Sequence, residues 1–180
     1  WIELMITYIV ILRGINVSGK NILPMAELRE LLTKLKFENV QTYIQSGNIV
    51  LNSVQPKEEV VEMVKTGIAS KFGYDVPVLA KTISEWEKAI ANNPYPTENH
   101  KIVSFTFLSE MPKETTVEVN ITNDDVYTVI EDMVYMYCPD GFGRTKLTNN
   151  LFEKKLKVTA TSRNFRSTMK LFEMAKNNKS

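Results

Sequence analysis

Residues 7–32, TYIVILRGINVSGKNILPMAELRELL, run from a strand through a polar loop into a helix, and they decide the predicted fold. Residues 7–13 are apolar on both faces, which is typical of a central strand covered on two sides. Pro24 then opens the helix at its first turn, where the missing N–H of proline costs nothing. The leucines that follow recur at helical spacing, with charged residues on the other face. The chain is therefore predicted to begin with a strand followed by an amphipathic helix.

Outward from this stretch, the pattern continues with a hairpin, a helix and a strand. Residues 40–45 and 48–52 are rich in strand-forming residues, and a Ser-Gly pair between them predicts a tight turn. Residues 56–81 contain a helical apolar stripe that ends at a glycine, followed by a fourth strand. The order βαββαβ predicts a ferredoxin-like subdomain over residues 5–82.

Residues 83–180 predict a second α+β subdomain, packed with the first into one compact unit. Ser84 is a candidate N-cap for a helix that Pro94 ends. Further predicted elements are a strand at 101–108, a turn-rich stretch at 109–124 with one helical turn after Pro112, a hairpin at 126–138, and two C-terminal helices near 147–156 and from 164. No internal sequence repeat is visible. Residues 1–4 precede the natural strand start at Met5, and we interpret them as a vector-derived extension.

The composition is that of a soluble globular protein. Hydrophobic residues make up 43% of the 180 residues and charged residues 24%, which is ordinary for that class. No apolar run reaches the length of a membrane span, and no signal-peptide pattern is visible. Cys138 is the only cysteine, so no disulfide can form within one chain. These features predict a cytoplasmic protein that does not enter membranes.

The charge is distributed unevenly along the chain. From Arg144 to the end there are ten Lys or Arg and two Glu, a net charge of +8, whereas the remainder carries −7. Such asymmetry favours an acidic partner or nucleic acid. The alternative is that the basic segment docks on the acidic body of its own chain. Sequence alone leaves both open.

The loop at residues 14–21, GINVSGKN, differs from a Walker A motif at its last position, where Asn21 replaces Ser or Thr. A phosphate-binding loop also needs its helix to begin at the Gly-Lys pair, but Ile22 and Leu23 intervene before Pro24. Nucleotide hydrolysis is therefore disfavoured. Two interpretations remain: an anion-binding nest of loop N–H groups with Arg13 and Lys20, or a structural loop whose asparagines satisfy its own backbone.

Other chemistries find little support. His100 and Cys138 are the sole residues of their types, which excludes a Cys/His metal cluster and disfavours a catalytic triad. The adjacent acidic residues at 124–125 and 131–132 are not expected to form a catalytic pair of carboxylates, because neighbouring residues on a strand point to opposite faces. The βαββαβ order is shared by RNA-recognition modules, but residues 48–52 lack the base-stacking aromatics of that module. No metal and no cofactor are expected.

Three polar clusters remain as the candidate ligand-binding site, with catalytic residues unknown. They are Arg13, Asn16 and Lys20; Ser46 and Asn48; and Arg144, Lys146, Asn149 and Arg163. In a ferredoxin-like unit strands one and three are antiparallel neighbours, so the first two clusters should meet. Cations and amides that converge suit a phosphate group. The alternative is a network of hydrogen bonds between the subdomains.

At these clusters the chain resembles the domain of unknown function 1697 family of bacterial proteins. The resemblance rests on LRGINVSGKN with PMAELRELL, on TYIQSGNIVL, and on GFGRTKLTNNLFEKKLKVTATSRNFRSTMKL, and it covers nearly everything from Met5. Family members usually carry a second glycine at the position of Ser18 and often an aromatic at that of Leu51. The resemblance implies an α+β fold with ferredoxin-like units. It implies no activity, because none is established for the family.

These observations lead to one functional hypothesis and two alternatives. The first is a protein that binds a phosphate-bearing ligand, nucleic acid or nucleotide, through Arg13, Lys20, Asn48, Arg144, Lys146 and Arg163. The second is an enzyme of unassigned reaction acting on a small anionic metabolite in the same place. The third is a protein-interaction module, which would require an exposed apolar patch. The oligomeric state cannot be read from the sequence.

Overall fold

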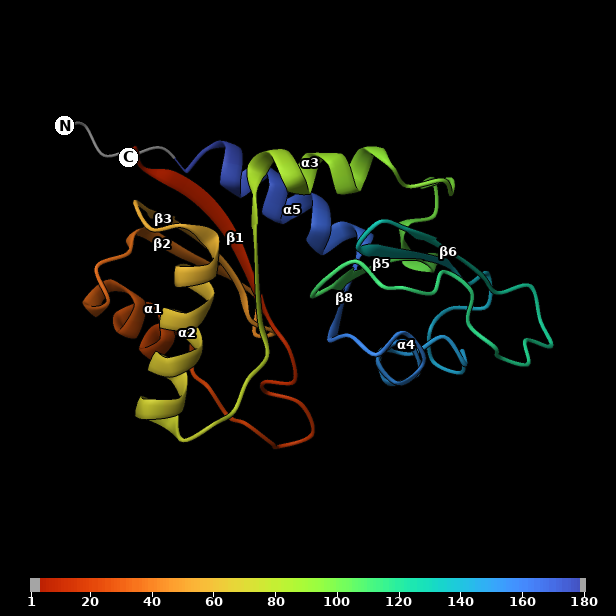
Figure 1. The fold of residues 1–180 in the computed structure, drawn as a ribbon, viewed down its shortest axis with the longest axis horizontal. Helices are drawn as coiled ribbons and strands as arrows, with labels where there is room; N and C mark the ends of the chain where they lie inside the picture. The colour runs from red at the N-terminus through yellow and green to blue at the C-terminus, as the bar shows by residue number, and fades with distance from the viewer. Residues whose placement is uncertain (1–3, 179–180) are drawn as a thin grey trace. The chain divides into compact units, whose positions relative to one another are not determined.

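The computed structural model describes residues 4–178, which form an α+β fold with two four-stranded antiparallel sheets and five α-helices (Figure 1). The chain divides into two units. The first runs to Glu87 and includes the C-terminal segment from Lys170, and the second is Lys88–Met169. The sequence prediction placed a boundary after residue 82 and did not include the return of the C-terminal segment to the first unit. Residues 1–3 of the expected extension lie outside the described residues.

The first unit is built on a sheet in the order β2-β3-β1-β4. β1 pairs with both β3 and β4 in antiparallel register, as expected of the central strand that its two apolar faces predict. The element order agrees with the predicted βαββαβ, and the bounds are β1 (Ile6–Leu12), α1 (Met25–Lys34), β2 (Glu38–Tyr43), β3 (Asn48–Ser53), α2 (Lys57–Phe72) and β4 (Val78–Thr82), with α3 (Ile83–Ala91) following directly.

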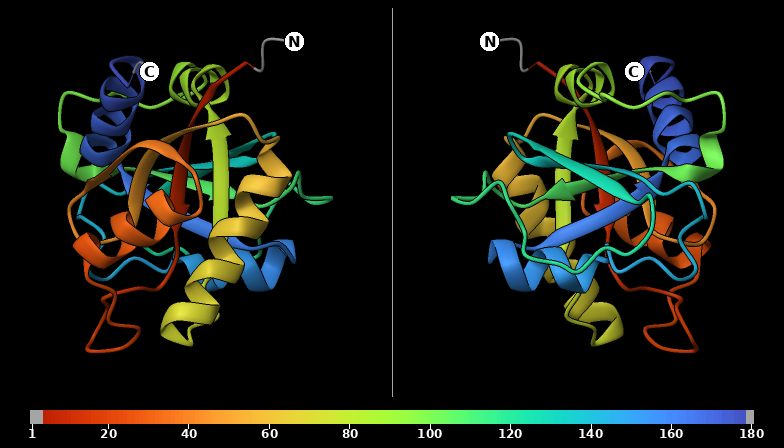
Figure 2. Two further views of the ribbon diagram at one scale, coloured as in Figure 1. Left: turned by 90° about the vertical axis from the view of Figure 1, so that its left-hand side faces the viewer. Right: turned by 90° about the vertical axis from the view of Figure 1, so that its right-hand side faces the viewer.

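The central strands β1 and β3 of this sheet are buried on both faces. α1 and α2 lie on the same face (Figures 1 and 2), where alternate residues of β1 pack with apolar residues of β3 and of both helices. These residues include Tyr8, Val10, Leu12, Ile49, Leu51, Leu28, Val64 and Ile68. The intervening residues Ile9, Ile11 and Val50 point to the other face because side chains alternate along a strand, and they are fully buried too. The doubly apolar sequence of β1 is explained by this position.

The second unit repeats the strand order of the first. Its sheet has the order β6-β7-β5-β8, which places the four strands as β2, β3, β1 and β4 are placed in the other sheet. Its elements are η1 (His100–Ile102), β5 (Val103–Leu108), β6 (Val126–Ile130), β7 (Met133–Tyr137), α4 (Asn149–Leu156) and β8 (Ala160–Asn164), followed by α5 (Phe165–Lys176), which continues into the first unit. The repeat lies in the strand order, and it is not visible in the sequence because the residues of the two units differ.

Residues 109–125 form the main departure from that repeat. They connect β5 to β6 without a helix, where α1 connects β1 to β2, and the helical turn predicted after Pro112 is absent from them. In Figure 1 they are the green to blue-green loop between β5 and β6. The hydroxyl of Tyr127 binds the backbone N–H and carbonyl of Val117, at 2.6 and 3.2 Å, and so fastens the segment to β6. Val117 is buried in the core of the second unit.

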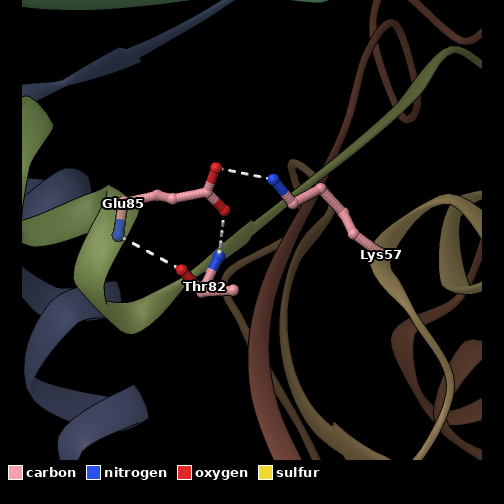
Figure 3. Close-up of polar contacts among 3 residues, drawn as sticks. All are labelled: Lys57, Thr82 and Glu85. Carbon is pink, nitrogen blue, oxygen red and sulfur yellow. Dashed lines mark hydrogen bonds and ion pairs between the residues drawn. The ribbon is translucent and has the colours of Figure 1, made fainter.

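Two further local predictions were wrong. β8 was missed because its five residues, ATSRN, are short and mostly polar, so they show no clear alternation. Ser84 was predicted to cap α3, but that helix begins one residue earlier. Its cap is Thr82, whose hydroxyl accepts from the Glu85 N–H at 3.2 Å while the Glu85 carboxylate accepts from the Thr82 N–H at 2.9 Å (Figure 3). The residues thus form a T-x-x-E capping box, a signal present in the sequence.

Glu85 also links α3 to the start of α2. Its other carboxylate oxygen lies 2.5 Å from the Lys57 ammonium (Figure 3). Partial burial raises the pKa of Glu85, but the Lys57 contact and the Thr82 N–H outweigh it, and the net effect lowers the pKa below 4.5. A carboxyl group whose pKa falls on folding stabilises the protein above its unfolded pKa, and the stabilisation is lost as the pH drops through the folded value.

We therefore expect Glu85→Gln to lower the melting temperature at pH 7 and to have progressively less effect below about pH 4.5. Glutamine keeps the acceptor for the Thr82 N–H, so the variant isolates the charge. Because both side chains are about one-third exposed, solvent screening limits the effect to about 1 kcal/mol or less. Thermal melts from pH 7 to pH 3 measure it. The control is Glu110→Gln at an exposed position, which should leave the melting temperature unchanged at every pH. A decrease in melting temperature in Glu85→Gln that is the same at pH 3 as at pH 7 would contradict the assignment of the effect to the charge of Glu85.

The C-terminal segment joins the first unit through buried amides. The Asn178 carbonyl accepts from the Asn52 side-chain N–H at 3.0 Å, and its own side-chain N–H donates to the Asn52 oxygen at 3.1 Å. Gln41 of β2 donates to the Asn178 side-chain oxygen, and Thr7 of β1 donates to Asn52. Asn178 is thereby tied directly to β2 and β3, and through Asn52 to β1, which agrees with the assignment of the C-terminal segment to the first unit.

Candidate functional site

The polar loop after β1 is folded on itself by its asparagines. Asn16 donates to the Leu23 carbonyl at 3.0 Å and accepts from the Leu23 N–H at 2.8 Å. The Asn21 side chain donates to the Gly14 carbonyl at 3.0 Å, and the backbone carbonyl of Asn21 accepts from the Asn16 backbone N–H at 3.1 Å. Gly14 has a φ of +74°, and the two asparagines have φ near +50°, a region that asparagine tolerates better than most residues. The predicted structural loop, whose asparagines satisfy its backbone, agrees with this geometry.

The first two polar clusters meet, as predicted from the antiparallel neighbours β1 and β3. The second amide hydrogen of Asn16 donates to the Gln45 carbonyl at 2.8 Å, and the Leu12 N–H donates to the Gly47 carbonyl at 2.9 Å. Asn48 is fully buried, and its side-chain amide donates to the Tyr43 carbonyl and to the Ser46 hydroxyl. Both amide hydrogens of Asn16 and both of Asn48 are therefore used within the protein.

This arrangement also differs from that of a Walker A phosphate-binding loop. α1 begins at Met25, four residues after the last position of the near-motif, and Asn21 uses its amide inside the loop. The N-terminus of α1 is therefore not at the Gly-Lys pair, and the loop has no place for the metal-binding hydroxyl of that motif. Lys20 is exposed, and Arg13 is partly exposed where the loop begins. These two side chains are the parts of the first two clusters best suited to meet a ligand.

Large apolar residues are exposed at the same end of the first unit. Val17 is 57% exposed, and Ile22 and Ile44 are each 52% exposed. The hydrogen bond from Asn16 to Gln45 places their two loops side by side. Ile44 has a φ of +51°, which is strained for a β-branched residue and therefore needs support from its surroundings. This exposed apolar surface is a feature that the sequence did not predict.

In the second unit, two of the predicted cations lie at adjoining cavities. The larger cavity, of about 540 Å³, is lined by Asn123, Asp140, Gly141, Gly143, Arg144 and Thr145. The smaller cavity, of about 50 Å³, is lined by Ile121, Thr122, Asn123, Asp125, Arg144 and Lys146. Among the residues that the structure describes, the side chains of Arg144 and Lys146 have no hydrogen-bond or ion-pair partner. Both are exposed and available to an anion.

Asp125 is the unexpected member of this site. Its side chain is 5% exposed, and one carboxylate oxygen has no hydrogen-bond partner within residues 4–178. Asp125 is the last residue of the segment that replaces a helix in the second unit, and the same segment brings Asn123 to both cavities. The sequence prediction set Asp124 and Asp125 aside because neighbouring residues point to opposite faces, and nothing in the sequence marks Asp125 as the buried one of the two.

Cys138 lies next to this carboxylate. Burial, together with the charge of Asp125 and a hydrogen bond to it, raises the pKa of the Cys138 thiol to about 11, although the Thr145 hydroxyl opposes the shift. The thiol lies 3.6 Å from that hydroxyl. Because a thiolate is the reactive form, Cys138 is a poor nucleophile at neutral pH. Its predicted position in the core is confirmed.

The remaining two residues of the third cluster belong to β8 and α4. The Asn149 side chain accepts from the Ser162 hydroxyl at 2.5 Å, and so fastens the first residue of α4 to β8. The Arg163 guanidinium donates to the Ser162 carbonyl at 2.9 Å, and burial lowers its pKa to about 10. Neither residue lines the two cavities. The structure therefore groups Arg144 and Lys146 with Asn123 and Asp125, and places Asn149 and Arg163 in the packing of the sheet.

Fold and cavities together describe an α+β protein made of two antiparallel-sheet units, the second of which carries a partly basic cavity. The chain belongs to a protein family of unknown function, DUF1697, whose model matches residues 5–135. That match covers the first unit apart from its C-terminal segment, and the second unit as far as β7. The resemblance found in the sequence is thus confirmed.

A solved structure extends the comparison to the whole fold. The conserved bacterial protein SP0830 from Streptococcus pneumoniae is 26% identical, covers 96% of this chain and 99% of its own, and superimposes with a TM-score of 0.71. No curated protein matches the chain. Within residues 4–178, no helix is long and apolar enough to cross a membrane, and no group of three or more His, Cys, Asp or Glu residues is placed to hold a metal ion.

Proposed function

We propose that this protein binds a phosphate-bearing ligand, a nucleotide or nucleic acid, at Arg144 and Lys146. The observation that supports the proposal is that these two cations border adjoining cavities without a partner among the described residues. An unpaired arginine beside a cavity offers two parallel N–H groups, which match the geometry of phosphate oxygens. The larger cavity falls within the usual size range of small-molecule sites.

The sequence around Arg144 supports the same proposal. Gly141 and Gly143 line the larger cavity and have no side chain to obstruct a ligand. Arg144 also opens the segment of the chain that carries a net charge of +8. Within the second unit, Lys88–Met169, ten Lys or Arg balance ten Asp or Glu, so the attraction of an anion rests on the local charge of Arg144 and Lys146. Arg13 and Lys20 remain predictions as additional ligand contacts, whereas the side chains of Asn48 and Arg163 make hydrogen bonds within the protein.

A second candidate function is a protein-interaction site at the other unit. Exposed Val17, Ile22 and Ile44 on two loops joined by a hydrogen bond favour it, because exposed apolar side chains that cluster mark interaction surfaces. The two proposals concern different parts of the molecule. Both can hold for one protein, with the first unit contacting a partner and the second holding a phosphate-bearing ligand.

We also infer that the first unit is ferredoxin-like and that the protein is cytoplasmic. The βαββαβ order and the strand order β2-β3-β1-β4 support the first inference. The second is supported by Cys138, the single cysteine of the chain, which is buried as a free thiol.

We expect the double variant Arg144→Ala/Lys146→Ala to bind inorganic phosphate at least about tenfold more weakly than wild type, because each lost charged contact is worth roughly 1.5–3 kcal/mol. Titrations followed by NMR measure the affinity. For a short oligothymidylate, the same variant should lower the slope of log affinity against log salt by about 1.4, or about 0.7 for each lost phosphate contact. A loss for phosphate alone would identify a small ligand, and a loss for both would identify nucleic acid.

The matched control is Lys154→Ala/Lys155→Ala. These lysines are exposed on α4 of the same unit, and their removal changes the net charge equally. The control should retain the affinity of wild type. An equal loss in both double variants would reduce the effect to overall charge and contradict the proposed site, as would the absence of any binding by wild type.

A further inference from the structure

The buried carboxylate of Asp125 is the starting point. Its backbone N–H is held by the Asn123 side chain at 3.2 Å, so the residue is fixed in position, while one side-chain oxygen has no partner within residues 4–178. Buried polar atoms are rarely left unsatisfied, and an unpaired carboxylate oxygen is among the costliest to bury. A protein that keeps such an atom beside a cavity gains if something that enters the cavity donates a hydrogen to it.

The smaller cavity limits what that donor can be. About 50 Å³ accommodates one water molecule or one group of similar size, such as a hydroxyl. Arg144 and Lys146 line the same cavity, so an ammonium group would meet two like charges there. A neutral hydroxyl meets no such repulsion and can donate to the carboxylate while it accepts from a cation.

The two cavities are joined by shared residues. Asn123 and Arg144 line both of them, so a ligand held in the larger cavity can extend one group into the smaller one. Arg144, which lines the larger cavity, would hold its phosphate with Lys146 beside it at the smaller cavity, and Asp125 would accept from a hydroxyl on the same molecule. We infer that the ligand of this site is a phosphorylated polyol, such as a sugar phosphate or the ribose phosphate of a ribonucleotide, and that Asp125 recognises its hydroxyl group. This inference rests on the proposed function and names the substrate class of the same site.

Two phosphate monoesters test the inference on the wild-type protein. Methyl phosphate carries the phosphate without a hydroxyl, and ribose 5-phosphate carries both. We expect ribose 5-phosphate to bind about tenfold more tightly or better, because a hydrogen bond to a charged acceptor contributes at least that much. Equal affinities would overturn the inference and leave the proposed phosphate site standing. Failure of both probes to bind would overturn the two together.

The variant Asp125→Ala should remove the advantage of ribose 5-phosphate and leave the affinity for methyl phosphate the same or slightly higher. Asp124→Ala, the exposed neighbour, should leave both affinities unchanged. Asp125 also forms a hydrogen bond with the Cys138 thiol, so the affinities of the variant are measured well below its melting temperature. An undiminished preference for ribose 5-phosphate in Asp125→Ala would overturn the inference.

Discussion

Gly47→Ala should destabilise the protein by about 3 kcal/mol, because the substitution adds a steric clash to a backbone conformation that alanine disfavours. Gly47 has a φ of +84°, and an added Cβ would lie 2.7 Å from the Leu12 Cβ and 3.0 Å from the Ile15 Cδ1. Leu12 is fully buried in β1, and its N–H donates to the Gly47 carbonyl. β1 and the turn before β3 therefore cannot separate to relieve the contact without losing this hydrogen bond. A decrease of about 6–12 °C in melting temperature is expected.

Gly14→Ala is the matched control. Gly14 also has a positive φ, +74°, but no atom lies within 4 Å of the position of an added Cβ. It should therefore lose only about 1 kcal/mol, the cost of the left-handed conformation. If the two variants melted at the same temperature, the close approach of β3's turn to β1 would have no energetic importance. Both measurements need only purified protein and a thermal melt.

Asn52→Ala should destabilise the protein by about 2–4 kcal/mol, through the buried amides that hold the C-terminal segment. Asn52 is 1% exposed and exchanges hydrogen bonds with Thr7 and with both the backbone and side chain of Asn178. Its removal leaves buried donors and acceptors of Asn178 unsatisfied, which costs more than the bonds themselves. Hydrogen exchange should show a large loss of protection near Asn178 at the end of α5.

A double-mutant cycle separates this link from general loss of packing. If the residues act together, Asn52→Ala and Asn178→Ala should show a coupling energy of about 1–2 kcal/mol. The control is Asn177→Ala, an exposed neighbour in the same turn, which should change stability by less than about 0.5 kcal/mol. Additive effects of the first pair would refute the linkage between the C-terminal segment and β3.

The strands and helices of the first unit were predictable because local signals in the sequence agree with the structure at each element. The apolar pattern of β1, Pro24 before α1 and the Ser-Gly pair before β3 are local signals, and each acts within a few residues. The second unit has weaker signals. β8 pairs with β5 along its whole length, yet its sequence is polar, so the partner strand decides its conformation.

The candidate site divides in the same way. The meeting of the loop after β1 with the turn before β3 followed from strand order, and the structure places Asn16 within 2.8 Å of the Gln45 carbonyl. What each amide does there did not follow. Asn16 and Asn48 have the composition of ligand-binding residues, but their hydrogens are used by the backbone. Composition gives the donors that are present, and only coordinates show which are already engaged.

By itself, the sequence determined the order of elements in the first unit, the central position of β1, and the identity of Arg144 and Lys146 as candidate cations. Only the tertiary structure decided that the second sheet repeats the strand order of the first, that the segment from Lys170 returns to the first unit, and that Asp125 is buried with an unpaired oxygen. The physical reason is the separation along the chain over which each kind of interaction acts. Helix periodicity, strand alternation and turn chemistry act between near neighbours, whereas burial and hydrogen-bond satisfaction depend on residues far apart in the chain.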